Sequence, residues 1–396
     1  MTSSSFKSGN ASDDYQEESG ILDSELIEDR LMDAFDNLTA KSAKTRLVAF
    51  EFIRKTLTER YLLDYILTRK ITILDSINRS IKRSKGQDLG CAANLISIVC
   101  VIIGPEPETD PIFSELVSQL LILLDDQTVQ LDVRSKCARA IAICTYLIGV
   151  EGYIEQVMDK LYAIFSASCA KGDGTMPNPN EQLAALHSTC LNAWSLLLTA
   201  VSSSSQHLAI ELIEEHMDKI TELLDSPHLD IKISAGECLA IMYETIKAQN
   251  EEVTCEDFED LCEKLRDLMN EAHKSRGKKD LRHQRSNFRE LLALIEEGDS
   301  AGVTIKFGRE RLVLESWARR RQYDVFRELL GTGMNLHLAE NEVLRDIFGL
   351  GAAVAHMDLP RVKRSDNSYE NMIADKNRTK NLRRLRDKRA DVIDRC

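Results

Sequence analysis

The chain has 396 residues, of which 43% are hydrophobic and 29% are charged, and its formal net charge is −13. It is too long for one compact helical bundle, and its hydrophobic content is enough to fill an extended core. Because it has no apolar run of about 18 residues and its start resembles neither a signal peptide nor a transit peptide, we expect a soluble, intracellular protein without membrane contact.

The charge is unevenly distributed along the chain. Residues 274–396 contain 27 Lys and Arg against 19 Asp and Glu, a net charge of +8, whereas the preceding residues contain 24 against 45, a net charge of −21. An acidic region followed by a basic one predicts two kinds of partner. The basic end is the candidate for binding the phosphates of a nucleic acid.

Helical segments follow a short disordered start. Residues 1–20 are acidic and rich in serine, with almost nothing to bury, so we expect disorder there. Beyond them, apolar residues recur at helical spacing and only 7 prolines occur. Helices of similar character begin near Ser42, Asp88, Asp132, Glu181 and Asp230, at separations of 46, 44, 49 and 49 residues. This period is typical of armadillo and HEAT arrays, in which each helical pair buries its apolar face against its neighbours.

One unit of this array is present in two similar copies, Leu120–Ile148 and Glu222–Ile246. In each copy a helix ends at Leu-Leu-Asp, and a second helix follows a short polar turn. We expect Asp132 and Asp230 to be the N-cap residues of the second helices, because their carboxylates could accept bonds from first-turn amides. Small residues in the middle of these helices, such as Gly236, predict the close approach of a neighbouring helix.

The part of the chain from Lys274 onward has a different character. VTIKF, at residues 303–307, is a strand-like alternation, and the aromatic residues that follow predict a compact helical module ending near Gly351. The pattern of the tail predicts a basic amphipathic helix, which forms either in the free protein or on binding a partner. We predict that nucleic acid binds two groups of basic residues, which are Lys274, Arg276, Lys278, Lys279, Arg282 and Arg285, and Lys376, Arg378, Lys380, Arg383, Arg384, Arg386, Lys388 and Arg389.

These patterns predict an all-α protein: an armadillo- or HEAT-like α-solenoid followed by a small, mostly helical C-terminal domain and a basic tail. The expected divisions are a disordered N-terminus, the helical repeats, the C-terminal domain, and a linker with the tail helix, at residues 1–20, 21–273, 274–352 and 353–396.

No pattern of catalytic residues stands out. The 8 histidines lack metal-ligand spacing, and we expect His187 to be a packing residue with its hydrogen bond satisfied. The 10 cysteines form no CxxC pair, which favours reduced core thiols over disulfides or zinc. Gly331-Thr332-Gly333 lacks the features of a dinucleotide site and predicts a helix C-cap turn. We therefore expect no enzymatic activity, no metal or other cofactor, and no small-molecule substrate.

Four long blocks of the C-terminal part are distinctive: KKDLRHQRSNFR (278–289), IKFGRERLVLESW (305–317), QYDVF (322–326) and LGTGMNLHLAENEVLRDIFGLG (330–351). In these blocks the sequence resembles the interferon-related developmental regulator family. The resemblance implies a helical-repeat domain, a small C-terminal domain and a non-enzymatic regulator of gene expression. It implies either transcriptional co-regulation in differentiating cells or binding to translationally idle ribosomes, and it carries over no catalytic residue.

Two functions therefore remain open. The first is a translational repressor that associates with ribosomes or ribosomal RNA through its basic C-terminal part. The second is a nuclear transcriptional co-regulator whose solenoid surface binds protein partners, with the basic tail serving nuclear import. A general adaptor without nucleic-acid contact is a third possibility. We expect a monomer located in the cytoplasm and the nucleus, since a solenoid with polar terminal helices needs no partner to close its core.

Overall fold

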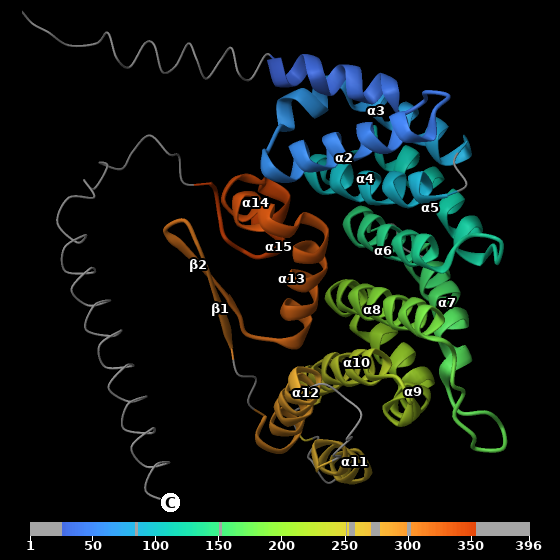
Figure 1. Ribbon diagram of the computed structural model, residues 1–396. Helices are drawn as coiled ribbons and strands as arrows, with labels where there is room; N and C mark the ends of the chain where they lie inside the picture. The colour runs from blue at the N-terminus through green and yellow to red at the C-terminus, as the bar shows by residue number, and fades with distance from the viewer. Residues whose placement is uncertain are drawn as a thin grey trace, which may run out of the picture. The chain divides into compact units, whose positions relative to one another are not determined.

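The computed structural model describes residues 26–83, 86–149, 153–250, 252, 258–270, 278–298 and 302–353, except for the side chains of residues 278–283. Among these residues, six inner helices stack in chain order, each packed against the next (Figure 1). They are α2 (Ala43–Glu59), α4 (Gln87–Ile103), α6 (Leu131–Ile148), α8 (Glu181–Ser204), α10 (Leu229–Gln249) and α12 (Lys278–Glu297).

A second layer of helices alternates with the inner layer along the chain. Each of its helices packs against the inner helix that follows it, and two of them continue into short 3-10 turns, η1 (Ser166–Ser168) and η2 (Leu223–Asp225). Residues 26–37 form a further helix ahead of α2. The outer helices are α3 (Leu63–Arg83), α5 (Asp110–Asp125), α7 (Tyr153–Phe165), α9 (Gln206–Glu222) and α11 (Glu259–Asn270).

The observed helices confirm the predicted solenoid. The inner helices begin at residues 43, 87, 131, 181, 229 and 278, which are 44, 44, 50, 48 and 49 residues apart. The expected division after residue 273 thus falls between α11 and α12, which pack on each other as a last pair. Gly236 in α10 allows α12 to approach, since a Cβ atom there would lie 2.9 Å from the Phe288 ring. Residue 236 therefore has the close helix contact that its small size predicted.

The N-caps expected at Asp132 and Asp230 are wrong. The caps lie two residues earlier than expected, at Gln130 and His228, and neither of these residues makes a side-chain capping bond. Asp132 lies in the first turn, where its negative charge still interacts favourably with the helix dipole. Its carboxylate accepts a 2.7 Å bond from Gln87 of α4, so it joins neighbouring inner helices instead of capping its own.

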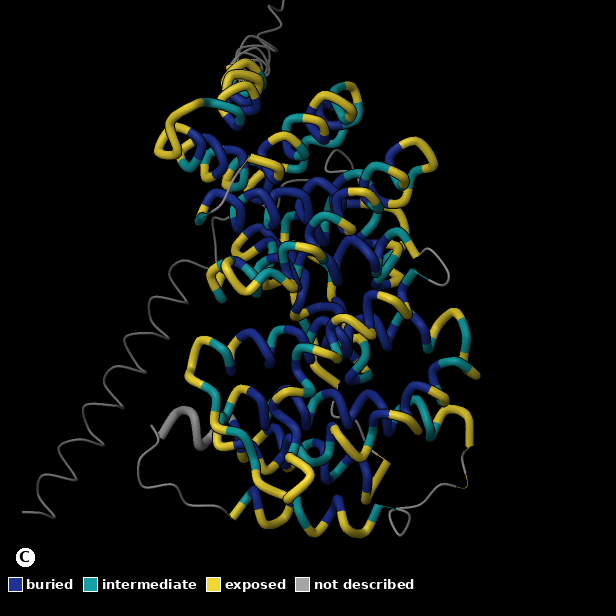
Figure 2. Tube along the Cα trace, turned by 90° about the vertical axis from the view of Figure 1, so that its right-hand side faces the viewer, coloured by how far each residue is buried: buried dark blue, intermediate teal, exposed yellow. Residues whose placement is uncertain are grey.

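Buried residues concentrate in the middle of the stack, between the helical layers (Figure 2). Within the described residues, α8 alone is long and apolar enough to cross a membrane, and 78% of its most apolar window is buried in the fold. All eight cysteines that the structure describes are free thiols, and seven of them are buried. The burial of α8 and of these cysteines is typical of core helices in a helical array.

His187 lies in α8 and is only 5% exposed. Its Nδ1 forms a 2.6 Å hydrogen bond with Ser168 Oγ in η1, which confirms a satisfied packing residue. Burial, together with the nearby positive charges of Arg134 and His228, lowers the pKa of His187 from 6.5 to about 4. The imidazole is therefore neutral in the folded protein at pH values where it would already be protonated in the unfolded chain.

We expect His187 to weaken the fold on acidification. Between pH 6.5 and 4, His187 binds a proton in the unfolded chain but not in the folded protein. The free energy of unfolding therefore falls as the pH drops. The shift corresponds to at most about 3 kcal/mol. Urea denaturation across this range should show a shallower pH dependence in His187→Gln than in the wild type. The exposed His207→Gln serves as control, and equal slopes in all three proteins would contradict the assignment.

A third layer, formed by the C-terminal segment, lies on the inner helices (Figure 1). It consists of α13 (Trp317–Leu330), the turn η4 (Gly331–Gly333), α14 (Met334–Glu340) and α15 (Glu342–Ile347). Helix α13 contacts α4, α8 and α10, whereas α14 contacts α2 and α15 contacts α4. The C-terminal segment up to Ala353 therefore belongs to the same compact unit as the repeats.

Two expectations for this layer hold. The aromatic side chains of Trp317, Tyr323, Phe326 and Phe348 are buried, as a compact module requires. Gly331 ends α13 with a φ of +57°, so the Gly-Thr-Gly sequence is a C-cap turn.

An antiparallel hairpin precedes α13. Its first strand is the predicted one, β1 (Val303–Phe307), and its second, β2 (Glu310–Leu314), was not predicted. Val303 pairs with Leu314 and Phe307 with Glu310, so the turn consists of Gly308 and Arg309. Among the described residues these two strands form the only sheet.

Candidate interaction surfaces

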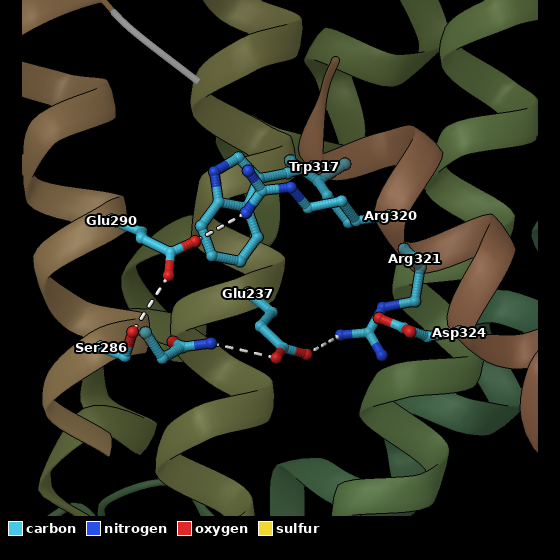
Figure 3. A pocket seen from close by; sticks show the side chains of 9 residues that line it. Glu237, Ser286, Glu290, Trp317, Arg320, Arg321 and Asp324 are labelled. Carbon is cyan, nitrogen blue, oxygen red and sulfur yellow. Dashed lines mark hydrogen bonds and ion pairs between the residues drawn. The ribbon is translucent and has the colours of Figure 1, made fainter. Parts of the chain in front are cut away.

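The contact between α13 and the repeats is built on ionic and polar side chains. Arg321 of α13 donates a 2.6 Å bond to Glu237 of α10, and Glu237 also accepts a 3.0 Å bond from Asn287 of α12. Arg320 donates a 2.8 Å bond to Glu290 of α12 and lies over the Trp317 ring (Figure 3). These side chains tie three helices together around a cavity of about 180 Å³.

The start of α13 is held by a partly buried carboxylate. Glu244 of α10 accepts bonds from the backbone amides of Trp317, at 2.8 Å, and Ala318, at 3.2 Å. Burial raises the pKa of Glu244, and these two amide bonds oppose the shift. A negative charge at a helix N-terminus stabilises the otherwise unpaired first-turn amides. Glu244 thereby fixes where α13 begins on the array.

Polar contacts also join the far end of the C-terminal layer to the first repeats. His337 Nε2 donates a 3.0 Å bond to the carbonyl of Leu57, and Asn341 Nδ2 donates a 3.0 Å bond to the carbonyl of Val101. The Asn341 side-chain oxygen caps α15 by accepting from two first-turn amides. The inner face of the array is therefore covered from α2 to α10 by the protein's own C-terminal segment.

The hairpin is attached through Arg345 of α15, whose side chain is only 2% exposed. Its guanidinium donates two bonds to the Glu310 carboxylate, at 2.9 and 2.8 Å. It also donates to backbone carbonyl groups on both sides of α15, which are those of Leu338, Ala339, Leu350, Gly351 and Ala352. One buried side chain thus organises the last described part of the chain.

A groove lies at one edge of the array. It has a volume of about 1,420 Å³ and lies between the turn that leads into α6 and the loop that leads into α8. Asn178 in this loop forms a 3.1 Å hydrogen bond with the ring of His228, which holds the loop against the next repeat. The groove is mixed polar and apolar and remains open, so it is the candidate surface for a protein partner.

The predicted nucleic-acid-binding residues fall mostly beyond the part that the structure describes. Arg285 is exposed on α12, and the backbones of Lys278, Lys279 and Arg282 lie in the same helix. Lys274, Arg276 and the tail residues Lys376, Arg378, Lys380, Arg383, Arg384, Arg386, Lys388 and Arg389 lie outside the described residues.

Sequence reasoning missed three exposed cations on the hairpin, Lys306, Arg309 and Arg311. The alternation in RLVL, which places Arg311 opposite Lys306, was the signal that could have found them. Within the described residues, no group of three or more His, Cys, Asp or Glu is placed to hold a metal ion.

Comparison with known proteins gives consistent matches along the chain. Residues 1–296 match the profile described as interferon-related developmental regulator, and residues 341–390 match the interferon-related protein conserved region. The chain is 36% identical to interferon-related developmental regulator 2 of Mus musculus, over 93% of this chain and 84% of that protein. It is 35% identical to interferon-related developmental regulator 1 of Homo sapiens, over 93% and 82%. Among solved structures, an engineered protein is similar at 14% identity, with a TM-score of 0.39, over 67% of this chain and 97% of that one.

Proposed function

Because the chain belongs to the interferon-related developmental regulator family, we propose that it regulates gene expression by binding ribosomes through RNA and keeping them inactive. Family membership indicates a regulatory role. The proposed mode is a rigid helical scaffold whose basic C-terminal part contacts phosphates. The bound protein then represses translation by occupying the ribosome.

The observation that carries the proposal is the charge distribution. The chain is acidic overall, yet residues 274–396 have a net charge of +8. A local excess of positive charge attracts anionic partners, and phosphate contacts of this kind give sequence-independent affinity that falls with salt. Ribosomal RNA supplies the required density of phosphates.

The covered inner face supports the same mode of binding. Helical arrays commonly bind partners on their concave surface. Here α13, α14 and α15 pack on that surface, and the ion pair between the buried Arg321 and the partly buried Glu237 ties α13 to α10. A large partner must therefore meet the outer helices, the edges of the array or the basic C-terminal part.

Substitution of the tail cations tests this proposal. In the variant, Lys376, Arg378, Lys380, Arg383, Arg384, Arg386, Lys388 and Arg389 are replaced by glutamine. If about six of them contact phosphates, the affinity of the intact chain for purified ribosomes should fall with salt at a log–log slope of about −4. Pelleting through a sucrose cushion at rising salt should show weaker and less salt-dependent binding of the variant.

A charge-preserving control separates this effect from an altered tail conformation. Exchanging each tail lysine for arginine, and each arginine for lysine, keeps every positive charge. This control should pellet like the wild type. Equal pelleting of the glutamine variant and the wild type at every salt concentration would contradict a role of the tail in ribosome binding.

A second candidate is a nuclear co-regulator that scaffolds chromatin-modifying proteins. The open groove beside His228 and the net charge of −21 on residues 1–273 favour a protein-binding array. On this account the tail directs nuclear import. Deleting residues 376–396 should then abolish nuclear accumulation and leave the binding of protein partners unchanged, whereas the ribosomal account predicts the loss of ribosome binding.

A further inference from the structure

The two faces of the β1–β2 hairpin differ sharply. Residues directly opposite each other in an antiparallel pair share a face, and side chains alternate between faces along each strand. One face carries Phe307, Leu312 and Leu314, which are buried against the rest of the C-terminal layer. The other face carries Thr304, Lys306, Arg311 and Val313, all of which are exposed.

The hairpin is held firmly from its buried side. Strand β1 packs against α14 and β2 against α13. Glu310, at the beginning of β2, receives both bonds from the buried Arg345 guanidinium. The exposed cations therefore extend from a fixed platform, and ordering them on a partner costs little backbone entropy.

The exposed face places like charges together. Lys306 and Arg311 are directly opposite each other in the register, which puts their Cβ atoms about 5 Å apart. Arg309 adds a third cation in the turn, next to Gly308 with its φ of +51°. No described acidic side chain pairs with any of these three. Like charges directly opposite each other destabilise a sheet, so this arrangement opposes folding.

We propose that this face of the hairpin, formed by Lys306, Arg309 and Arg311, is a second contact for the RNA phosphate backbone. The inference rests on the proposed RNA association and adds a site distinct from the tail. An anionic chain that runs across the strands neutralises the repulsion between Lys306 and Arg311. The face has no aromatic side chain on which a base could stack, so it contacts backbone phosphates and does not read sequence.

Another explanation of these charges gives a different expectation. Charged side chains on an exposed strand prevent edge-to-edge pairing with another copy of the chain. On that account, loss of the three cations leaves RNA affinity unchanged and promotes self-association. A glutamine variant and a glutamate variant distinguish the two explanations, because glutamates keep the strand charged and cannot bind phosphate.

The test uses the full chain and a labelled oligouridylate, followed by fluorescence anisotropy. Three lost contacts at about 0.7 counterions each predict that Lys306→Gln/Arg309→Gln/Arg311→Gln binds roughly 100-fold more weakly near 0.1 M salt, with a log–log salt slope shallower by about 2. The glutamate variant should bind more weakly still while remaining monodisperse on sedimentation. Lys306→Arg/Arg311→Lys, which keeps the charges, should bind like the wild type.

A matched control removes three exposed cations from the first repeat. Lys41→Gln/Lys55→Gln/Arg60→Gln makes the same change in net charge and should leave affinity within about twofold, because the effect depends on local contacts and not on total charge. Wild-type affinity in both hairpin variants, together with weak binding by the tail variant, would overturn the hairpin site alone. Failure of the intact chain to bind the RNA at low salt would overturn the hairpin site together with the proposed function.

Discussion

Replacing Arg345 by methionine is expected to destabilise the protein by about 3–5 kcal/mol. The guanidinium is buried and donates to the Glu310 carboxylate and to a set of backbone carbonyls around α15. Methionine fills similar space but leaves the Glu310 charge and these carbonyls without their donor. Water can still solvate the partly exposed Glu310, so most of the cost comes from the backbone carbonyls that lose a charged donor inside the fold, at about 1–3 kcal/mol each. Urea denaturation monitored by tryptophan fluorescence should measure the loss.

The effect should depend on the shape of the guanidinium as well as on its charge. Arg345→Lys keeps a cation but loses the two-pronged bond to Glu310, so we expect an intermediate loss of stability. The hydrogen bond from Arg345 lowers the pKa of Glu310. Its stabilising contribution is therefore present above the carboxyl group's unfolded pKa, is lost as the pH falls through the folded pKa, and should be missing in Arg345→Met. Wild-type stability in Arg345→Met would contradict this role.

Gly333→Ala is expected to detach α14 from the first repeat. A Cβ atom at residue 333 would collide with the carbonyl oxygen of Thr58, which belongs to the backbone of α2 and cannot rotate away. The two segments must separate, and the buried bond from His337 to the Leu57 carbonyl is lost with them. A loss of about 3 kcal/mol is expected, at the upper end of the range typical of overpacked cores. Amide hydrogen exchange should show faster exchange in Met334–Glu340.

Two other glycines provide graded controls for this substitution. Gly331→Ala places a Cβ in open space but has to adopt a φ of +57° with a ψ of −125°, a backbone conformation that is rare outside glycine, so we expect a cost of about 1–3 kcal/mol. Gly172→Ala has neither a close contact nor a positive φ and should have no effect. Similar hydrogen exchange in all three variants would show that the contact between η4 and α2 is not tight.

The solenoid could be predicted from the sequence because its signals are local and repeated. Apolar spacing and a recurring helix start mark each pair, and the starts at Ala43 and Glu181 lie within one residue of the positions expected from the pattern. The two N-caps were missed because Gln130 and His228 are not usual capping residues, whereas the aspartates two positions later are. The local sequence pattern therefore predicted that these helices exist but misplaced their first residues.

The C-terminal layer could not be predicted as a covering of the inner face. Its contacts join residues far apart in the chain, such as Arg321 with Glu237 and Gln322 with Thr199, which are 84 and 123 positions apart. Arg345 looks like an ordinary surface charge in the sequence, and only the fold shows that it is buried. Strand β2 was missed because it begins with two charged residues and its alternation of polar and apolar residues is short. Without this strand, the sequence did not indicate that the cations of the hairpin share one exposed face.

Sedimentation of cell lysate on a sucrose gradient tests the central claim most directly. The account predicts that the intact chain travels with single ribosomes at low salt and is released steeply as salt is raised, because phosphate contacts supply the affinity. If the chain stays at the top of the gradient at every salt concentration, ribosome association is contradicted, and the nuclear scaffold becomes the better explanation of the basic C-terminal part.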